Sequence, residues 1–431
     1  MTKTRVLHPH LKGDAREPSA ALAEGMSLTA ALDLELEGGK VVTLSQVTPA
    51  TLFGPGKVAE IGAEIAEAGT EVVVVNGALS PVQQRNLERA WKAKVLDRTG
   101  LILEIFGERA ATREGVLQVE LAHLTYQKSR LVRSWTHLER QRGGAGFMGG
   151  PGETQIESDR RQIDEKIVKL RRQLEKVART RSLHRTKRKK IPHPVVALVG
   201  YTNAGKSTLF NRMTTAEVLA KDMLFATLDP TMRRIRLPSG RPAILSDTVG
   251  FISDLPTQLV AAFRATLEEV LEADLIVHVR DISHPATAAQ KADVIGVLDD
   301  LGLGPAEIDG MLEVRNKIDL LDGTAREAVE DAATAQGALT LSAATGEGVG
   351  RLLDEIEARL YPRRFRFRFR LEHAQGAAVA WLYAHTDVRA REDSVAGVSL
   401  EAEMTEREYF QFEKAHGIAA ETVRRLDLAA Q

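Results

Sequence analysis

The segment Gly200-Tyr201-Thr202-Asn203-Ala204-Gly205-Lys206-Ser207 comes directly after the apolar run Pro194-Val195-Val196-Ala197-Leu198-Val199. The pattern Gly-x-x-x-x-Gly-Lys-Ser between a buried strand and a helix is typical of a loop that binds a nucleoside triphosphate. Its glycines let backbone N–H groups surround the phosphates, and the helix that starts near Lys206 adds the positive end of its dipole. We expect Lys206 to contact the β- and γ-phosphates and Ser207 to bind Mg²⁺.

A second motif, Asp247-Thr248-Val249-Gly250, follows the apolar run Ala243 to Leu245. In nucleotide switches an acid at this position supports Mg²⁺, either directly or through water, and the N–H of the glycine detects the γ-phosphate. The next residue, Phe251, stands where Ras-like proteins carry the glutamine that orients the attacking water. An apolar ring cannot orient water, so the sequence predicts slow hydrolysis until another group is supplied.

Two further motifs indicate the base. Asn316-Lys317-Ile318-Asp319 follows a predicted strand over Met311 to Arg315, and Ser342-Ala343-Ala344 follows Leu339 to Leu341. The Asp319 carboxylate can accept both the N1–H and the exocyclic amino group of guanine, and adenine offers no such pair. Four motifs in this order, each at a strand end, predict a GTP site.

The loop before Asp247 has the sequence Leu224-Phe225-Ala226-Thr227-Leu228-Asp229-Pro230-Thr231. Nucleotide switches use a threonine here to complete the Mg²⁺ shell when the γ-phosphate is present. Thr227 is the better candidate and Thr231 the alternative, because the spacing does not separate them.

The patterns divide the chain into five parts: a flexible tail (1–26), an α/β domain (27–108), a helical hairpin (109–191), a nucleotide domain (195–361) and a small α+β domain (363–431). In the first domain, strand-like runs (28–36, 71–75) alternate with helical ones (58–68, 81–93). Gly54-Pro55-Gly56-Lys57 reads as a turn before a helix rather than a second phosphate loop. In the last domain, Phe365 to Arg370 alternates phenylalanine with arginine, which predicts a strand with one buried face. There we expect helices over 374–384 and 405–416, a strand over 398–404, and a solvated arginine face.

The hairpin is predicted from two apolar seams at alternating spacings of four and three, one from Leu117 to Leu138 and one from Ile156 to Val177. The glycine-rich segment 143–152 separates them, and Thr154 with Glu157 reads as a capping box that begins the second helix. Two such helices should fold back as an antiparallel pair with the glycine-rich segment at its tip.

The second helix of this hairpin carries a long series of basic residues from Arg160 to Lys190, and Arg130, Arg133, Arg140 and Arg142 of the first helix add to it. A solvated helix face usually mixes charges of both signs. An excess of one sign in a chain of net charge −1 favours a nucleic-acid partner, and the elongated geometry suits structured RNA. A solvated face remains the alternative.

The bulk composition excludes several classes of protein. The chain of 431 residues has no cysteine, which excludes a disulfide framework and fits a reducing compartment. Its first 25 residues lack the apolar core of a signal peptide, and no apolar run reaches the length of a membrane span. We therefore expect a cytoplasmic protein of several domains, with a peripheral association with membranes left open. We also expect a monomer.

The motifs GYTNAGKSTLFN, LFATLDPT, DTVGFISDLP and NKIDLL, with WTHLERQ and GGPGETQIESDRRQ upstream, closely resemble those of the HflX GTPases, relatives of the Obg group. The resemblance covers residues 27 to about 360. It implies a Mg²⁺-dependent GTPase that binds the large ribosomal subunit through the N-terminal domain and the hairpin, with the tip toward the peptidyl transferase centre. It also implies that the protein dissociates ribosomal subunits or keeps them apart.

The same resemblance assigns phosphate binding to residues 200–207 and 247–250, Mg²⁺ to Ser207 and Thr227, and guanine to Asn316, Lys317, Asp319 and residues 342–344. The tip sequence Gly146-Phe147-Met148-Gly149-Gly150-Pro151 is bulkier than in many relatives. Two other functions stay open: a signalling switch with a protein partner, and an RNA-remodelling NTPase. Neutralising Arg171, Arg172, Lys187, Arg188 and Lys189 should abolish ribosome binding only if the ribosomal function is correct.

Overall fold

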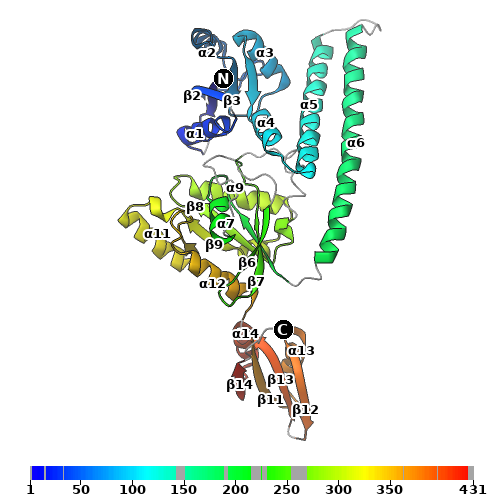
Figure 1. Cartoon of the computed structure of the whole chain (residues 1–431), viewed down its shortest axis with the longest axis vertical. Helices are drawn as coiled ribbons and strands as arrows, with labels where there is room; N and C mark the ends of the chain where they lie inside the picture. The colour runs from blue at the N-terminus through cyan, green and yellow to red at the C-terminus, as the bar shows by residue number, and fades with distance from the viewer. Residues whose placement is uncertain are drawn as a thin grey trace. The chain divides into compact units, whose positions relative to one another are not determined.

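The computed structural model describes residues 2–13, 16–32, 34–141, 151–188, 193–214, 225, 231–253, 269–362, 364–395 and 397–425. The chain forms two compact units, residues 1–350 and 351–431 (Figure 1). None of the helices in the described ranges combines the length and the apolar composition that a membrane span requires.

The N-terminal domain is an open sheet of parallel strands in the order β2-β1-β3-β4. Val72–Val75 of β3 is fully buried, as is typical of a parallel strand that is covered on both faces. Gly54 caps a helix that begins at Pro55, so Pro55, Gly56 and Lys57 form the first turn of α2 instead of the separate turn before a helix that the sequence predicts. The elements are β1 (Thr2–Leu11), α1 (Pro18–Thr29), β2 (Leu34–Leu44), α2 (Pro55–Ala68), β3 (Val72–Val75), α3 (Pro81–Trp91), β4 (Lys94–Asp97) and α4 (Arg98–Arg109).

The prediction of a flexible tail over residues 1–26 is wrong. This segment forms β1, an inner strand of the sheet that pairs with both β2 and β3, followed by α1. Thr4, Val6 and Leu7 provide its buried contacts, and the histidines and Pro9 around them hide this short apolar pattern. The predicted strand over 28–36 is also displaced, because α1 continues to Thr29 and β2 begins at Leu34.

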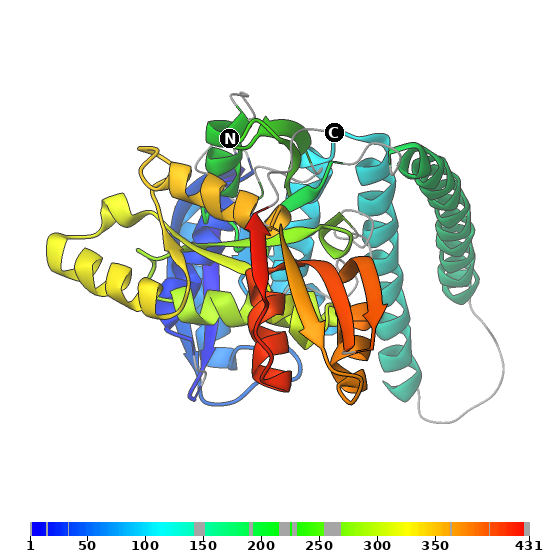
Figure 2. The ribbon, with the colours of Figure 1, turned by 90° about the horizontal axis from the view of Figure 1, so that it is seen from below.

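The helical hairpin consists of α5 (Arg113–Gln141) and α6 (Pro151–Arg188), which pack against each other (Figures 1 and 2). Leu117 of the first seam and Ile167 and Leu170 of the second are buried, and Lys128 forms an ion pair with Asp164 across the two helices. The second helix starts at Pro151, so the predicted start at Thr154 is wrong; proline at a first helical position has no N–H to lose. The rest of the tip, residues 142–150, lies outside the described residues.

The central part of the chain holds a six-stranded sheet in the order β10-β9-β8-β5-β7-β6. Its neighbours are parallel except for the edge strand β6, which pairs antiparallel with β7. This confirms the predicted mixed, mostly parallel α/β sheet. The elements are β5 (Val195–Val199), α7 (Lys206–Thr214), β6 (Thr231–Arg236), β7 (Pro242–Asp247), β8 (Leu275–Asp281), α9 (Thr287–Asp300), α10 (Pro305–Asp309), β9 (Leu312–Asn316), η1 (Ile318–Leu320), α11 (Gly323–Ala335) and β10 (Leu339–Thr340).

The C-terminal sheet is antiparallel, in the order β12-β13-β11-β14 (Figure 2). Phe367 and Phe369 of β11 are buried against α13 and α14, which confirms the alternating pattern. The arginines on the other face pair with acids of neighbouring strands or loops: Arg366 with Glu403, Arg368 with Glu401, and Arg370 with Glu421. The elements are α12 (Val349–Leu360), β11 (Arg364–Leu371), α13 (Gly376–His385), β12 (Asp387–Ser394), β13 (Gly397–Thr405), α14 (Glu406–His416) and β14 (Thr422–Arg425). Strands β12 and β14 were not predicted from the sequence.

Candidate functional site

The phosphate loop joins β5 to α7 at the carboxyl end of the central sheet. No other residue fits at its two glycines, because both have a positive φ and a Cβ at either position would clash with a neighbouring atom. Gly200 has a φ of 153°, and a Cβ there would lie 2.1 Å from the carbonyl oxygen of Val279. Gly205 has a φ of 90°, and its Cβ would lie 2.2 Å from Nδ2 of Asn316. The loop therefore has the tight backbone that a phosphate cradle needs.

Lys206 is buried at the start of α7, and its Nζ donates hydrogen bonds to the carbonyl oxygens of Gly200 (3.1 Å) and Tyr201 (2.8 Å). Burial lowers the pKa of Lys206 to about 8, and the negative charge of Asp247 opposes this shift. A phosphate group beside the ammonium would replace the solvation that burial removes. The site therefore fits an anionic ligand.

The expected metal position fits Mg²⁺ by the chemistry of its donors. The Ser207 hydroxyl donates a 2.7 Å hydrogen bond to Oδ2 of Asp247, and Asp247 is fully buried at the end of β7. Hydroxyl and carboxylate oxygens are donors that Mg²⁺ prefers, with substrate phosphates and water as its other ligands. Among the described residues no three His, Cys, Asp or Glu side chains converge as a metal site, so an all-protein cage is absent from that part of the chain.

The segment after Asp247 lies against the phosphate loop. The Thr202 N–H donates to the carbonyl oxygen of Phe251 (2.7 Å), and the Phe251 N–H donates to that of Gly200 (3.1 Å). A Cβ on Gly250 would lie 2.8 Å from Cα of Thr202 and 3.1 Å from Nζ of Lys206. Gly250 is thus next to Lys206, while the Phe251 ring, 1% exposed, packs into the apolar core.

Thr248 and Val249, two other residues of the predicted set, have structural contacts. The buried Thr248 hydroxyl donates to the carbonyl oxygen of Leu198 (2.6 Å), and Val249 belongs to the apolar core.

The base-side motifs also come together. Asn316 Nδ2 donates to the carbonyl oxygen of Ala204 (2.8 Å), and Asn316 Oδ1 accepts from the Ala343 N–H (2.9 Å). Lys317 forms an ion pair with Asp281 (2.8 Å), and Asp319 is exposed in η1, the short helix that follows β9. Ser342 is buried and Ala344 exposed in the neighbouring loop. Ile318 is buried, so its side chain packs in the protein instead of facing a ligand.

The loop with the candidate threonines is described only in part. Ala226, Thr227, Leu228 and Asp229 lie outside the described residues. Thr231, the alternative, is the first residue of β6 and pairs in register with Asp247. Phe225 has a φ of 56° and is buried, with its ring edge-on to Phe106 of α4 at 4.6 Å between centroids. Its side chain therefore contacts the N-terminal domain.

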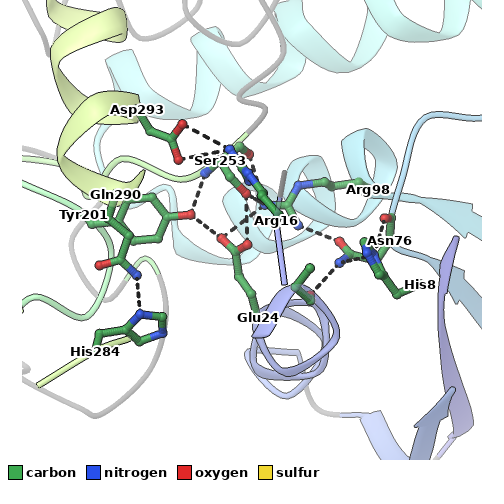
Figure 3. A network of polar contacts seen from close by, with 11 residues as sticks. His8, Arg16, Glu24, Asn76, Arg98, Tyr201, Ser253, His284, Gln290 and Asp293 are labelled. Carbon is green, nitrogen blue, oxygen red and sulfur yellow. Dashed lines mark hydrogen bonds and ion pairs between the residues drawn. The ribbon is translucent and has the colours of Figure 1, made fainter. Parts of the chain in front are cut away.

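A network of hydrogen bonds, here called the polar junction, connects this site to the N-terminal domain and was not predicted from the sequence (Figure 3). The Tyr201 hydroxyl of the phosphate loop donates to Oε1 of Glu24 (2.5 Å) and accepts from the Ser253 N–H (2.8 Å). Arg98 donates to the carbonyl oxygen (3.0 Å) and hydroxyl (2.7 Å) of Ser253. Glu24 and Tyr201 are 177 positions apart, and single polar residues at such separations leave no periodic signal in the sequence.

Four family models match consecutive parts of the chain: "GTP-binding GTPase N-terminal" (19–107), "GTP-binding GTPase Middle Region" (109–188), "50S ribosome-binding GTPase" (195–308) and "HflX C-terminal domain" (327–425).

Full-length relatives agree with these matches. GTPase HflX of Magnetococcus marinus is 52% identical over 89% of this chain and 87% of its own length. GTPase HflX of Escherichia coli is 45% identical over a region that covers 80% of this chain and 84% of the relative. The solved structure of a GTP-binding protein from Sulfolobus solfataricus in complex with GDP aligns with 83% of this chain and 98% of the Sulfolobus chain. The sequence identity is 21% and the TM-score 0.45, a structural similarity too low to support a statement about function.

The phosphate loop, the strand-end motifs, the four matched regions and these relatives agree, and the chain belongs to the HflX family of GTPases.

Proposed function

We propose that this GTPase binds the large ribosomal subunit in its GTP-bound state and dissociates ribosomal subunits or keeps them apart, and that hydrolysis of GTP to GDP and phosphate ends the interaction. The N-terminal domain and the helical hairpin would form the binding surface. The observation that carries the proposal is the basic charge of α6.

Between Lys166 and Lys190 the chain has twelve lysines and arginines and a single acid, Glu175. Where α6 side chains are described, its basic residues are exposed: Arg160, Arg161, Lys166, Lys169, Arg171, Arg172, Lys176 and Arg179. A helix of 38 residues is about 57 Å long, so these charges can follow an extended phosphate backbone. The description "50S ribosome-binding GTPase" of the model that matches residues 195–308 supports a ribosomal partner.

In the nucleotide site, we assign phosphate binding to residues 200–207 and 247–250, Mg²⁺ to Ser207 and Thr227, and guanine to Asp319 with the loops of Asn316 and Ala343. The bound Mg²⁺ would neutralise charge on the β- and γ-phosphates. Lys206 would add a fixed positive charge there, and Gly250, a neighbour of Lys206, would donate its N–H to the γ-phosphate.

Phe251 supports slow intrinsic hydrolysis, because its ring is buried and two backbone hydrogen bonds hold it on the phosphate loop. In this position it offers no group to orient a water molecule. We therefore expect low turnover by the protein alone and strong stimulation by large ribosomal subunits. Equal turnover with and without subunits would contradict this part of the proposal.

The test is sedimentation of purified ribosomes and subunits with the protein and either GDP or a non-hydrolysable GTP analogue. We expect co-sedimentation with the large subunit only with the GTP analogue, and a smaller fraction of intact ribosomes. The variant Lys166→Gln/Lys169→Gln/Arg171→Gln/Arg172→Gln should bind more weakly and show a smaller salt dependence.

The matched control neutralises three arginines that already have acidic partners, Arg366, Arg368 and Arg370, and should bind like the wild type. Wild-type binding by the α6 variant would instead favour a protein-directed switch. Turnover stimulated by RNA without ribosomes would favour an RNA-remodelling NTPase.

A further inference from the structure

Helix α4 contacts the nucleotide site at two points that are two turns apart. Arg98, its first residue, binds Ser253 in the segment that follows Gly250. Phe106, eight positions later, packs on Phe225, which precedes the candidate Mg²⁺ threonine. These two segments are the parts of a nucleotide switch that rearrange when the γ-phosphate is bound or lost. One rigid helix of the N-terminal domain therefore contacts both.

The first contact is a buried polar network (Figure 3). Arg98 is 6% exposed, and besides Ser253 it binds Oδ1 of Asn76 (2.5 Å) and pairs with Glu24 (3.2 Å). Glu24 in turn accepts hydrogen bonds from the hydroxyls of Tyr201 (2.5 Å) and Ser253 (2.9 Å). Truncating one partner would leave buried charge or polar groups uncompensated, so each of these contacts depends on the others.

This network lies where an open parallel sheet normally binds its ligand. Asn76 follows β3 and Arg98 follows β4, at the carboxyl ends of neighbouring strands. Ligands of such sheets bind outside these ends. Here Tyr201 of the phosphate loop and Ser253 occupy that place. The N-terminal domain therefore binds two residues of the nucleotide domain at the position where such a sheet usually binds a ligand.

The second contact involves backbone strain. Phe225 has a φ of 56°, a conformation that a bulky side chain rarely adopts and that persists only when its surroundings hold it. The Phe106 ring meets it edge-on in the shared apolar core. Loss of the Phe106 ring would allow Phe225 to leave this conformation.

The residue before Arg98 connects α4 to the hairpin. Asp97 is 3% exposed and caps α4 through the Gly100 N–H (2.8 Å). It also accepts from the Tyr126 hydroxyl (2.5 Å) and pairs with Arg130, both on α5. The Arg130 guanidinium stacks over the Tyr126 ring at 4.4 Å. At the start of α4, Arg98 thus binds the nucleotide site, and its neighbour Asp97 binds the hairpin.

We propose that α4 is the positioning element that couples the nucleotide state to the helical hairpin. Its contacts favour the arrangement in which Phe251 lies on the phosphate loop, and GTP must compete with them to draw Gly250 toward the γ-phosphate. By thermodynamic linkage, a ligand that displaces the hairpin also changes the preference of the site for GTP over GDP. The inference rests on the GTPase activity of the chain and not on a ribosomal partner, so it is tested on the protein alone.

The first measurement is the ratio of the affinities for a fluorescent GTP analogue and fluorescent GDP. Arg98→Gln and Phe106→Ala should each raise this ratio at least about fivefold, because each removes a contact that competes with GTP. Leu87→Ala is the matched control: Leu87 is buried in a separate apolar cluster made only of N-terminal residues, so its loss lowers stability but leaves the ratio unchanged. Ratios within twofold of the wild type for both α4 variants would overturn the proposal.

The second measurement is amide hydrogen exchange of α5 in the full chain with GDP and with the GTP analogue. We expect the exchange around Tyr126 to differ at least about fivefold between the two nucleotides in the wild type. Tyr126→Phe, which loses the hydrogen bond to Asp97, should reduce this difference. Identical exchange of the wild-type α5 in both nucleotides would refute the coupling, whatever the outcome with ribosomes.

Discussion

Asn316→Ala gives the sharpest test of how the nucleotide site is assembled. Asn316 ends β9, is 1% exposed, and joins two loops that come from distant parts of the sequence. Its amide donates to the carbonyl oxygen of Ala204 in the phosphate loop and accepts from the Ala343 N–H in the base-side loop. Both partners lie in buried residues, so the alanine variant leaves two buried polar groups without these bonds.

The magnitude follows from these two bonds. Each buried group left unsatisfied costs about 1–3 kcal/mol, or about 2–6 kcal/mol for the pair. Without a nucleotide, the two loops of the variant can separate and expose the groups to water. Binding must then bury them again, so the cost appears in the affinity. Because 1.4 kcal/mol changes a dissociation constant tenfold, the lower limit of about 2 kcal/mol corresponds to about a 30-fold loss of nucleotide affinity.

The assay is the dissociation constant of fluorescent GDP and of a fluorescent GTP analogue. Asn316 contacts neither Phe225 nor the 250–253 segment through any hydrogen bond described above, so both nucleotides should lose affinity by the same factor. Asn86→Ala, which removes an exposed hydrogen bond to Ala50 in the N-terminal domain, is the control and should change neither value. A loss smaller than threefold, or a changed ratio of the two affinities, would refute the reasoning.

Three further predictions concern the same domain. Asp319→Asn should weaken GTP binding at least about tenfold and favour xanthine nucleotides, because we propose that its exposed carboxylate accepts hydrogen bonds from the guanine edge; unchanged GTP affinity would exclude that role. Burial lowers the pKa of His278 to about 4, so the folded state holds this ring neutral while the unfolded chain protonates it near pH 6.5. Stability should therefore fall by about 2 kcal/mol between pH 7.5 and 5, and chemical denaturation of His278→Gln should show a decrease smaller by that amount. Gly200→Ala should lower the free energy of unfolding by more than about 2 kcal/mol, since its Cβ would lie 2.1 Å from the Val279 carbonyl oxygen; a melting temperature equal to that of the wild type would contradict this.

The sequence was sufficient for the elements whose signals are local. The phosphate loop, Asp247, Asn316 and the 342–344 loop were placed correctly because each follows a short apolar strand, and parallel strands bring their carboxyl ends to one edge. The alternating phenylalanines of β11 were equally clear, since the period of the pattern identifies the buried face. The hairpin seams were confirmed only in part: Leu117, Ile167 and Leu170 are buried, but Val119 and Ala122, which lie outside the first seam, are buried too.

Other features leave no local signal. The apolar residues of β1 are few and are mixed with histidine and proline, so an inner strand was read as a tail. The arginine face of β11 gave no indication of its partners, because cross-strand pairing with Glu401 and Glu403 depends on register. The junction of Glu24, Arg98 and Ser253 could not be predicted, since tertiary folding alone brings these single residues together.

The junction also has a consequence for the order of folding during synthesis. Arg98 and Ser253 are 155 positions apart. At about 5–20 residues per second, the N-terminal domain is complete roughly 8–30 s before Ser253 has been made. Throughout this interval Arg98 and Glu24 have each other and Asn76 as partners but lack the contacts to Ser253 that complete the network. We therefore expect translation that pauses between these two positions to increase aggregation of the nascent N-terminal domain, because part of its polar and apolar surface is covered only when the nucleotide domain docks.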